Sequence, residues 1–141
     1  MKITVDTNFL VSAIQWDYSV SHKLLMKLLE KEVKIFTTKD ILEEFSEILE
    51  RDFRYASEEI SNILGKVRAF ITLIETTSNV DIVKDDLDDN KIIACAVDSL
   101  SEYVISYDKH LLKLQKYEGI RIITPEEAMG VFDIMWKQAE K

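Results

Sequence analysis

Two aspartates of the sequence directly follow short apolar segments that are typical of β-strands. Asp6 comes after Ile3 and Val5, and Asp108 comes after the segment 103–107. In an open parallel sheet, ligands bind beyond the carboxyl ends of the strands. If these two strands are neighbours, their ends bring two carboxylates to one crevice. Because hard cations prefer oxygen ligands, this pattern indicates binding of Mg²⁺ or Mn²⁺ rather than zinc.

A third acid, Glu44, lies in a segment with helical periodicity. At about 100° per residue, the apolar stripe of residues 41–49 centres near Phe45. Glu44 falls at the edge of this stripe, whereas Glu43 and the two later glutamates of the segment point further outward. We therefore expect Glu44 to be the acid of this helix that reaches inward over the sheet.

A fourth acid, Asp89, stands three and four residues before Ile92 and Ile93 and continues their buried face towards the start of a helix. The segment 85–89 packs four carboxylates into five positions. That density costs electrostatic repulsion unless a cation neutralises it. The structural alternative is that an acid at a helix start caps the helix, and that an acid on a helix edge is solvated. The strand-end position of Asp6 is the hardest of the four to explain in this way.

Alternating strands and helices must position these acids. Five short runs are strand-like: Lys2–Asp6, Val33–Thr37, Phe70–Glu75, Tyr103–Tyr107 and Arg121–Thr124. Apolar residues with helical spacing follow capping types of residue near positions 19, 38, 57 and 89. This alternation predicts an α/β domain with a mainly parallel sheet. Without a repeat or a composition break, residues 1–141 are expected to form a single domain.

Composition limits the class of protein further. The 141 residues carry a formal net charge of −8, and the pI is about 4.8. This charge lacks the basic footprint of most nucleic-acid binders, but it suits a chain that concentrates carboxylates around cations. The single cysteine, Cys95, lies between two alanines and is expected to be a buried packing residue. With no signal-peptide pattern and no apolar run long enough to span a membrane, we expect a cytoplasmic protein.

The segments that carry the four acids resemble those of the PIN domain family. The opening segment 3–13, in which Asp-Thr-Asn follows an apolar strand, is similar to the family's first block. The segments 41–51, 86–96 and 104–112 are similar to its second, third and fourth acidic blocks, and 122–128 to its closing strand and helix. The resemblance runs through nearly the whole chain in order. It is closest to the VapC-type branch, the toxins of type II toxin–antitoxin pairs.

This resemblance implies a three-layer α/β/α fold with a mainly parallel five-stranded sheet in the order 3-2-1-4-5, which makes strands one and four neighbours. It also implies a Mg²⁺- or Mn²⁺-dependent endoribonuclease that hydrolyses RNA phosphodiester bonds, with an antitoxin protein and a second copy of the chain as partners. Carried over by position, the catalytic and metal-binding acids are Asp6, Glu44, Asp89 and Asp108. Asn8 and Ser106 would support them.

The sequence departs from the family's pattern at three positions near these acids. Leu87 stands where proline is frequent, Tyr107 where glycine is common, and His110 where aspartate is common. Tyr107 is expected either to narrow the crevice or to offer a stacking face for a base. Lys91 and Lys109 adjoin the acids and are the candidates for contacts with RNA phosphates.

Three other functions are compatible with parts of this pattern. A catalytically silent PIN-like module that binds RNA or acts as a scaffold would keep the fold without the chemistry. A phosphoryl-accepting signalling domain would need an acidic pair at the end of the first strand, where Thr7 and Asn8 follow Asp6. A structural domain that only binds cations would use the same acids without hydrolysis.

Overall fold

The computed structural model describes residues 1–83 and 87–140 of the chain. Its sheet has the strand order β3-β2-β1-β4-β6-β5. The strands are β1 (Lys2–Val5), β2 (Lys34–Thr37), β3 (Ile71–Leu73), β4 (Tyr103–Ile105), β5 (Lys116–Tyr117) and β6 (Ile120–Ile123). All neighbouring pairs are parallel except β5 and β6. The predicted α/β class, the mainly parallel sheet and the proximity of the first and fourth strands are confirmed.

The sequence did not predict the short strand β5, which extends the five-stranded order at its outer edge. It pairs with β6 in an antiparallel hairpin, in register from Tyr117 to Ile120. The two residues that join them, Glu118 and Gly119, both have positive φ angles, of 46° and 86°. Two-residue turns of this kind match the twist of a hairpin. A two-residue strand offers no alternation of polar and apolar residues from which it can be recognised.

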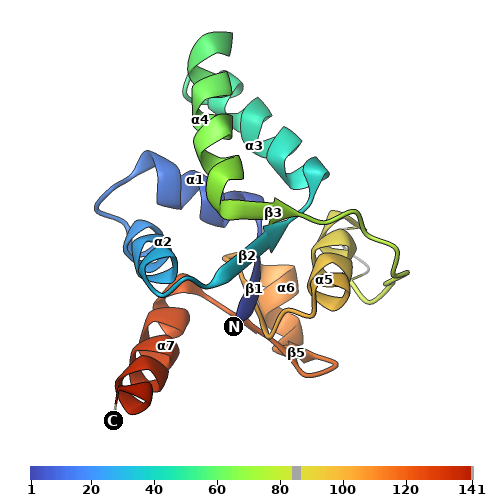
Figure 1. The fold of residues 1–141 in the computed structure, drawn as a ribbon. Helices are drawn as coiled ribbons and strands as arrows, with labels where there is room; N and C mark the ends of the chain where they lie inside the picture. Colours follow the sequence, from blue (N-terminus) through green and yellow to red (C-terminus); the bar gives the residue numbers. More distant parts are fainter. Residues whose placement is uncertain (84–86, 141) are drawn as a thin grey trace.

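Helices cover both faces of the sheet (Figure 1). They are α1 (Thr7–Gln15), α2 (Val20–Glu30), α3 (Lys39–Arg51), α4 (Ser57–Phe70), α5 (Leu87–Ser99), α6 (Lys109–Leu114) and α7 (Pro125–Ala139). On one side, α1 packs against α2 and α3, and α2 packs against α7. On the other side, α5 packs against β1, β2 and β4, and α6 against β6. In the described part of the chain, no helix is both long and apolar enough to cross a membrane.

The central strand β1 is buried from both sides, as the inner strand of a parallel sheet must be. Ile3 and Val5 are fully buried, and so is the hydroxyl-bearing Thr4 between them. The Thr4 hydroxyl lies 2.9 Å from Ser101 Oγ, so the polar group is satisfied inside the core. Cys95 on α5 is buried beside Thr4, and this burial raises the pKa of its thiol to about 11. The prediction of a buried packing cysteine is therefore confirmed.

The helix α5, which carries Asp89, is tied to the chain that precedes it by Asn90. The buried Asn90 amide accepts hydrogen bonds from the backbone N–H groups of Ile82 and Val83, at 3.0 and 2.8 Å. It donates one to the Val83 carbonyl at 2.9 Å. One side chain thus satisfies three backbone groups, and it fixes this connection to the first turns of α5.

Replacing Asn90 by alanine should release that connection. The lost hydrogen bonds leave the buried N–H and C=O groups of Val83 without partners, so we expect the free energy of unfolding to fall by about 1–3 kcal/mol. Hydrogen exchange should accelerate at the amides of Ile82 and Val83, while the amides of β1 stay protected. Unchanged protection at Ile82 and Val83 would contradict the role given to Asn90.

Candidate functional site

The four acids singled out by the sequence line one small cavity at the carboxyl ends of β1 and β4. These strands are parallel neighbours, with Val5 opposite Ile105 at their ends. The cavity has a volume of about 80 Å³. Its lining consists of Asp6, Thr7, Asn8, Ile41, Glu44, Asp88, Asp89, Ile92 and Asp108. The fold thus brings together acids that lie as far apart in the sequence as residues 6 and 108.

Asp6 is buried at the start of α1, and both of its carboxylate oxygens are held. Oδ1 accepts a hydrogen bond of 3.0 Å from the backbone N–H of Phe9, which makes Asp6 the N-cap of α1. Oδ2 accepts a hydrogen bond from the hydroxyl of Ser106. This capping role was not predicted from the sequence. The signal was the position of Asp6 directly before a helix, where aspartate is among the preferred residues.

Burial raises the pKa of Asp6 to about 6, and the hydrogen bonds from Ser106 and Phe9 offset only part of this effect. The negative charges of Asp108 and Glu44 raise it further. The pKa of Asp6 thus records repulsion among three of the four acids. A cation bound among them would relieve that repulsion, which is the physical reason to consider this cavity as a metal site.

Ser106 connects the ends of β1 and β4. Its buried hydroxyl donates to Asp6 and accepts a hydrogen bond of 2.9 Å from the backbone N–H of Asp108. Asp108 in turn caps α6, because its Oδ1 accepts from the backbone N–H groups of His110 and Leu111 at 2.8 and 3.2 Å. Asp6 and Asp108 therefore each have a structural role as well as a place in the cavity.

The remaining predicted site residues come from three helices. Asp89 is buried in the first turn of α5, and Asn8 is exposed in the first turn of α1. Glu44 is exposed on α3, at the edge of the buried stripe centred on Phe45. It lines both the acid cavity and an adjoining cavity of about 380 Å³, whereas Glu43 lines only the adjoining one. Glu44 therefore lines the acid cavity although the residue is exposed.

The type and charge of these residues fit a hard cation, because every side chain that could bind one offers oxygen. Among the residues that the structure describes, no three histidine, cysteine or acidic side chains are grouped closely enough to hold one metal ion directly. A cation in this cavity would therefore take part of its ligands from water. Mg²⁺ binds proteins in this manner and usually keeps several water molecules.

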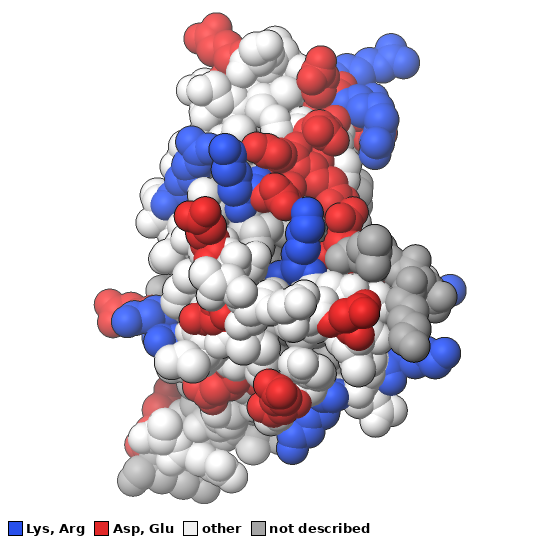
Figure 2. Space-filling view, turned by 90° about the vertical axis from the view of Figure 1, so that its right-hand side faces the viewer, with Lys and Arg blue, Asp and Glu red and all other residues white. Residues whose placement is uncertain are grey.

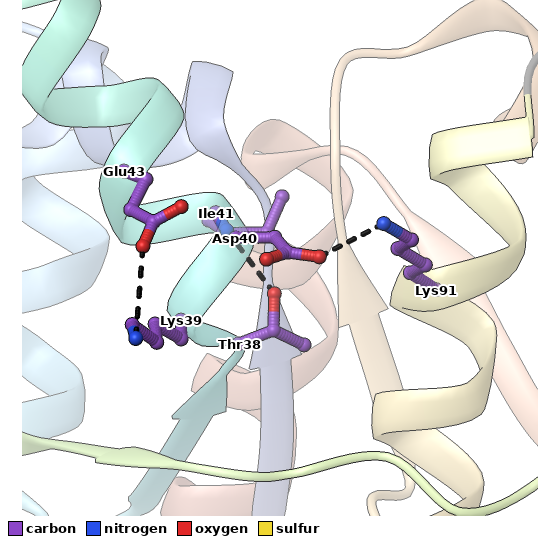
Figure 3. Close-up of polar contacts among 6 residues, drawn as sticks. All are labelled: Thr38, Lys39, Asp40, Ile41, Glu43 and Lys91. Carbon is purple, nitrogen blue, oxygen red and sulfur yellow. Dashed lines mark hydrogen bonds and ion pairs between the residues drawn. The ribbon is translucent and has the colours of Figure 1, made fainter.

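The described surface around the cavity carries many acidic side chains, with lysine and arginine side chains beside them (Figure 2). Figure 2 shows acidic side chains gathered on the upper part of this face, at the height of α3. Lys91 on α5 forms an ion pair of 2.8 Å with Asp40 on α3, and Lys39 forms one of 3.9 Å with Glu43 (Figure 3). Lys109, the other lysine predicted to contact RNA, is exposed at the start of α6.

The positions that depart from the family pattern differ in their relation to the cavity. The Tyr107 hydroxyl donates a hydrogen bond of 2.7 Å to Glu126 on α7, and Tyr107 is not among the residues that line the acid cavity. His110 is exposed on α6. Leu87 is the first residue of α5. Asp85 and Asp86, which contribute to the predicted dense acidic segment, lie outside the described residues.

The raised pKa of Asp6 predicts how the metal-free protein responds to pH. With a pKa of about 6 against a usual value of 3.8, the folded protein binds this proton more tightly than the unfolded chain. The ionised carboxylate therefore destabilises the fold progressively from about pH 4 to pH 6, and fully above that. In chelator at about pH 7, Asp6→Asn should raise the free energy of unfolding by up to about 3 kcal/mol.

At about pH 4 the charge should contribute much less to this difference, because Asp6 is then protonated in the folded protein and partly protonated in the unfolded chain. Asparagine can still cap α1, but its single oxygen cannot accept hydrogen bonds from both Phe9 and Ser106. That loss is the same at both pH values, so the part of the difference that changes with pH reports the charge. Denaturant unfolding of both proteins at the two pH values makes the measurement. An equal difference at both pH values would show that Asp6 does not titrate in this window.

Comparisons with known proteins agree with the fold. The PIN domain family matches residues 2–110 of this chain. An uncharacterized protein of Methanocaldococcus jannaschii is 28% identical over 150 aligned positions, which cover 94% of this chain and 92% of that protein.

Among solved structures, the fold is similar to that of a chain in the crystal structure of VapBC2 from Rickettsia felis bound to a DNA fragment from their promoter. The TM-score is 0.60, with 88% of this chain and 98% of that chain covered. At 13% identity, this likeness concerns the fold alone. The family match, in contrast, spans most of the sequence, including all four acids. The chain belongs to the PIN domain family.

Proposed function

We propose that this protein is a Mg²⁺- or Mn²⁺-dependent endoribonuclease and the toxin of a type II toxin–antitoxin pair. One observation carries the proposal: in a PIN domain, Asp6, Glu44, Asp89 and Asp108 line the same cavity at the carboxyl ends of β1 and β4. PIN domains are generally nucleases that use divalent metal ions. The pKa of Asp6 is raised mainly by its burial and further by the charges of Asp108 and Glu44, and a bound cation would offset both effects.

Hydrolysis of a phosphodiester needs a nucleophile, an aligned phosphate and relief of the charge on the leaving oxygen. A divalent cation, when bound, lowers the pKa of its water and neutralises phosphate charge. The buried acids Asp6 and Asp89 would hold it, and Glu44 and Asp108 would complete the site directly or through water. Water adds to phosphorus while the 3′ oxygen leaves and takes up a proton, which produces a 5′-phosphate end.

The neighbours of Asp6 orient its carboxylate for this role. The Phe9 N–H and the Ser106 hydroxyl each bind one of its oxygens, so the side chain has little freedom to rotate. Ser106 also accepts a hydrogen bond from the backbone N–H of Asp108, so this hydroxyl links the side chain of Asp6 to the start of α6. Such preorganisation is what a metal site requires of the groups around its ligands.

The role of toxin rests on the sequence blocks and on the fold shared with a chain of a VapBC2 structure. We propose an antitoxin protein and a second copy of this chain as partners, RNA as the substrate, and the cytoplasm as the place of action. The alternative is a catalytically silent PIN-like RNA-binding or scaffold module. It is favoured by the capping roles of Asp6 and Asp108, which account for two of the acids without chemistry.

Purified protein should cleave single-stranded RNA in Mg²⁺ or Mn²⁺ and lose this activity in chelator. Glu44→Gln should impair cleavage by at least about tenfold, because one ligand charge leaves the acid cavity. Glu43→Gln removes the same charge from a neighbouring residue that lines only the adjoining cavity, and should leave the rate nearly unchanged. Cleavage that persists in excess chelator, or equal losses from both variants, would exclude this site.

Thermal unfolding tests metal binding separately from catalysis. A cation that binds only the folded protein stabilises it by about 2.7 kcal/mol at 100 times its dissociation constant. Mn²⁺ should therefore raise the melting temperature of the wild type far more than that of Asp6→Asn or Asp89→Asn. Equal shifts in all three proteins would mean that these acids are helix caps and nothing more.

A further inference from the structure

Lys91 and Asp40 join two helices across the groove beside the acid cavity. The Lys91 ammonium on α5 lies 2.8 Å from Oδ2 of Asp40, in the first turn of α3. In Figure 3 the two side chains point toward each other across the space between these helices. Both are accessible, with 53% and 59% of their side-chain surfaces exposed.

Lys91 lies where the acidic part of the groove meets a neutral polar part. On one side it lines the adjoining cavity of about 380 Å³, which shares Glu44 and Asp88 with the acid cavity. On the other it lines a cavity of similar volume, here called the neutral cavity, with Thr76, Ser78, Asn79 and Asn90 among its walls. Within the described part of this lining, Asp81 is the one acidic residue, and it balances the charge of Lys91. Of the described residues that line these two cavities, Lys91 is the one with a cationic side chain.

The ends of the loop that forms the neutral cavity are fixed. Asp98 on α5 accepts hydrogen bonds from the backbone N–H groups of Thr77 and Ser78, at 2.7 and 3.2 Å. Further along, Asn90 binds Val83, as described above. The neutral cavity is therefore built by contacts with α5, the helix that also carries Lys91.

A strand of RNA that extends from the acid cavity along this groove carries a negative phosphate past several carboxylates. Lys91 is the cation on that path, but Asp40 neutralises it in the free protein. An exposed ion pair contributes little net stability, because solvent screens it and two side chains must be ordered. Exchanging Asp40 for a phosphate therefore costs little free energy.

We propose that Lys91 binds a backbone phosphate of the RNA outside the acid cavity, and that Asp40 holds Lys91 in the free protein and releases it when RNA binds. This proposal rests on the proposed RNA substrate. Asp40 then competes with the substrate for one cation, so RNA gains this contact only where one of its phosphates reaches Lys91 and displaces Asp40. The pair therefore favours RNA strands that place a phosphate at Lys91, beside the scissile phosphate.

A double-mutant cycle on RNA affinity tests the exchange. Binding of a labelled single-stranded RNA is measured by fluorescence anisotropy in chelator, where a metal-dependent nuclease does not turn over, at several salt concentrations. Lys91→Gln should weaken binding and reduce the slope of log affinity against log salt by about 0.7, the value for one phosphate contact on a single strand. Asp40→Asn should strengthen binding by about two- to fivefold, the range set by an exposed ion pair.

The gain from Asp40→Asn should largely disappear when Lys91 is already glutamine. Glu43→Gln is the matched control, because Glu43 lines the same adjoining cavity as Asp40 but pairs with Lys39. Its effect should be the same with and without Lys91. Since Lys91 and Asp40 are exposed, their variants should melt close to the wild type.

An equal gain from Asp40→Asn in both backgrounds would overturn the exchange, because the two charges would then act independently. Wild-type affinity and salt slope in Lys91→Gln would overturn the phosphate contact. If either result accompanies metal-dependent cleavage by the wild type, this inference fails and the proposed function stands. If the wild type neither binds nor cleaves RNA, both fail.

Discussion

The burial of one carboxylate, that of Asp6, sets the requirements that the surrounding structure meets. A buried charge is costly unless hydrogen bonds or an opposite charge compensate it. The first helix begins at Asp6 and supplies an N–H group to one oxygen, and the end of β4 supplies the Ser106 hydroxyl to the other. This arrangement is available only because β4 lies beside β1 in the sheet, although nearly 100 residues separate them in the chain.

These contacts offset the burial of Asp6 incompletely, as its raised pKa shows. The residual cost comes mainly from burial and in smaller part from the charges of Asp108 and Glu44, and a cation at the site that we propose binds metal would offset it. The acidic net charge acts in the same direction over the whole molecule, because it attracts cations and repels the phosphates of RNA. The basic side chains near the cavity then set how strongly a polyanion binds there. One of them, Lys91, is paired with Asp40.

The parts of this structure that the sequence predicted are those with strong periodicity or with a residue at the end of a strand. The stripe around Phe45 gave the phase of α3, and with it the different positions of Glu43 and Glu44. Strand ends gave Asp6 and Asp108. Asp89 was placed by the buried face of α5. In each case local geometry carries the information, because side chains repeat at fixed intervals along helices and strands.

Features that depend on contacts between distant segments were not predictable in the same way. The ion pair of Lys91 with Asp40 joins residues 51 positions apart, and nothing in either segment indicates the other. The bond from Tyr107 to Glu126 likewise depends on how β4 and α7 are packed. Asp6 was recognised as a strand-end acid but not as a cap, because α1 begins without a break directly after β1.

The two outermost strands of the sheet, β3 and β5, are short. β3 has three residues and β5 has two. An exposed strand edge offers unpaired N–H and C=O groups on which another chain can add a strand, and short edges limit this hazard. Here neither edge is long enough to guide a stable added strand. Copies of this chain that associate are therefore expected to contact each other through helices. The sheet of one copy is not expected to continue into the sheet of the next.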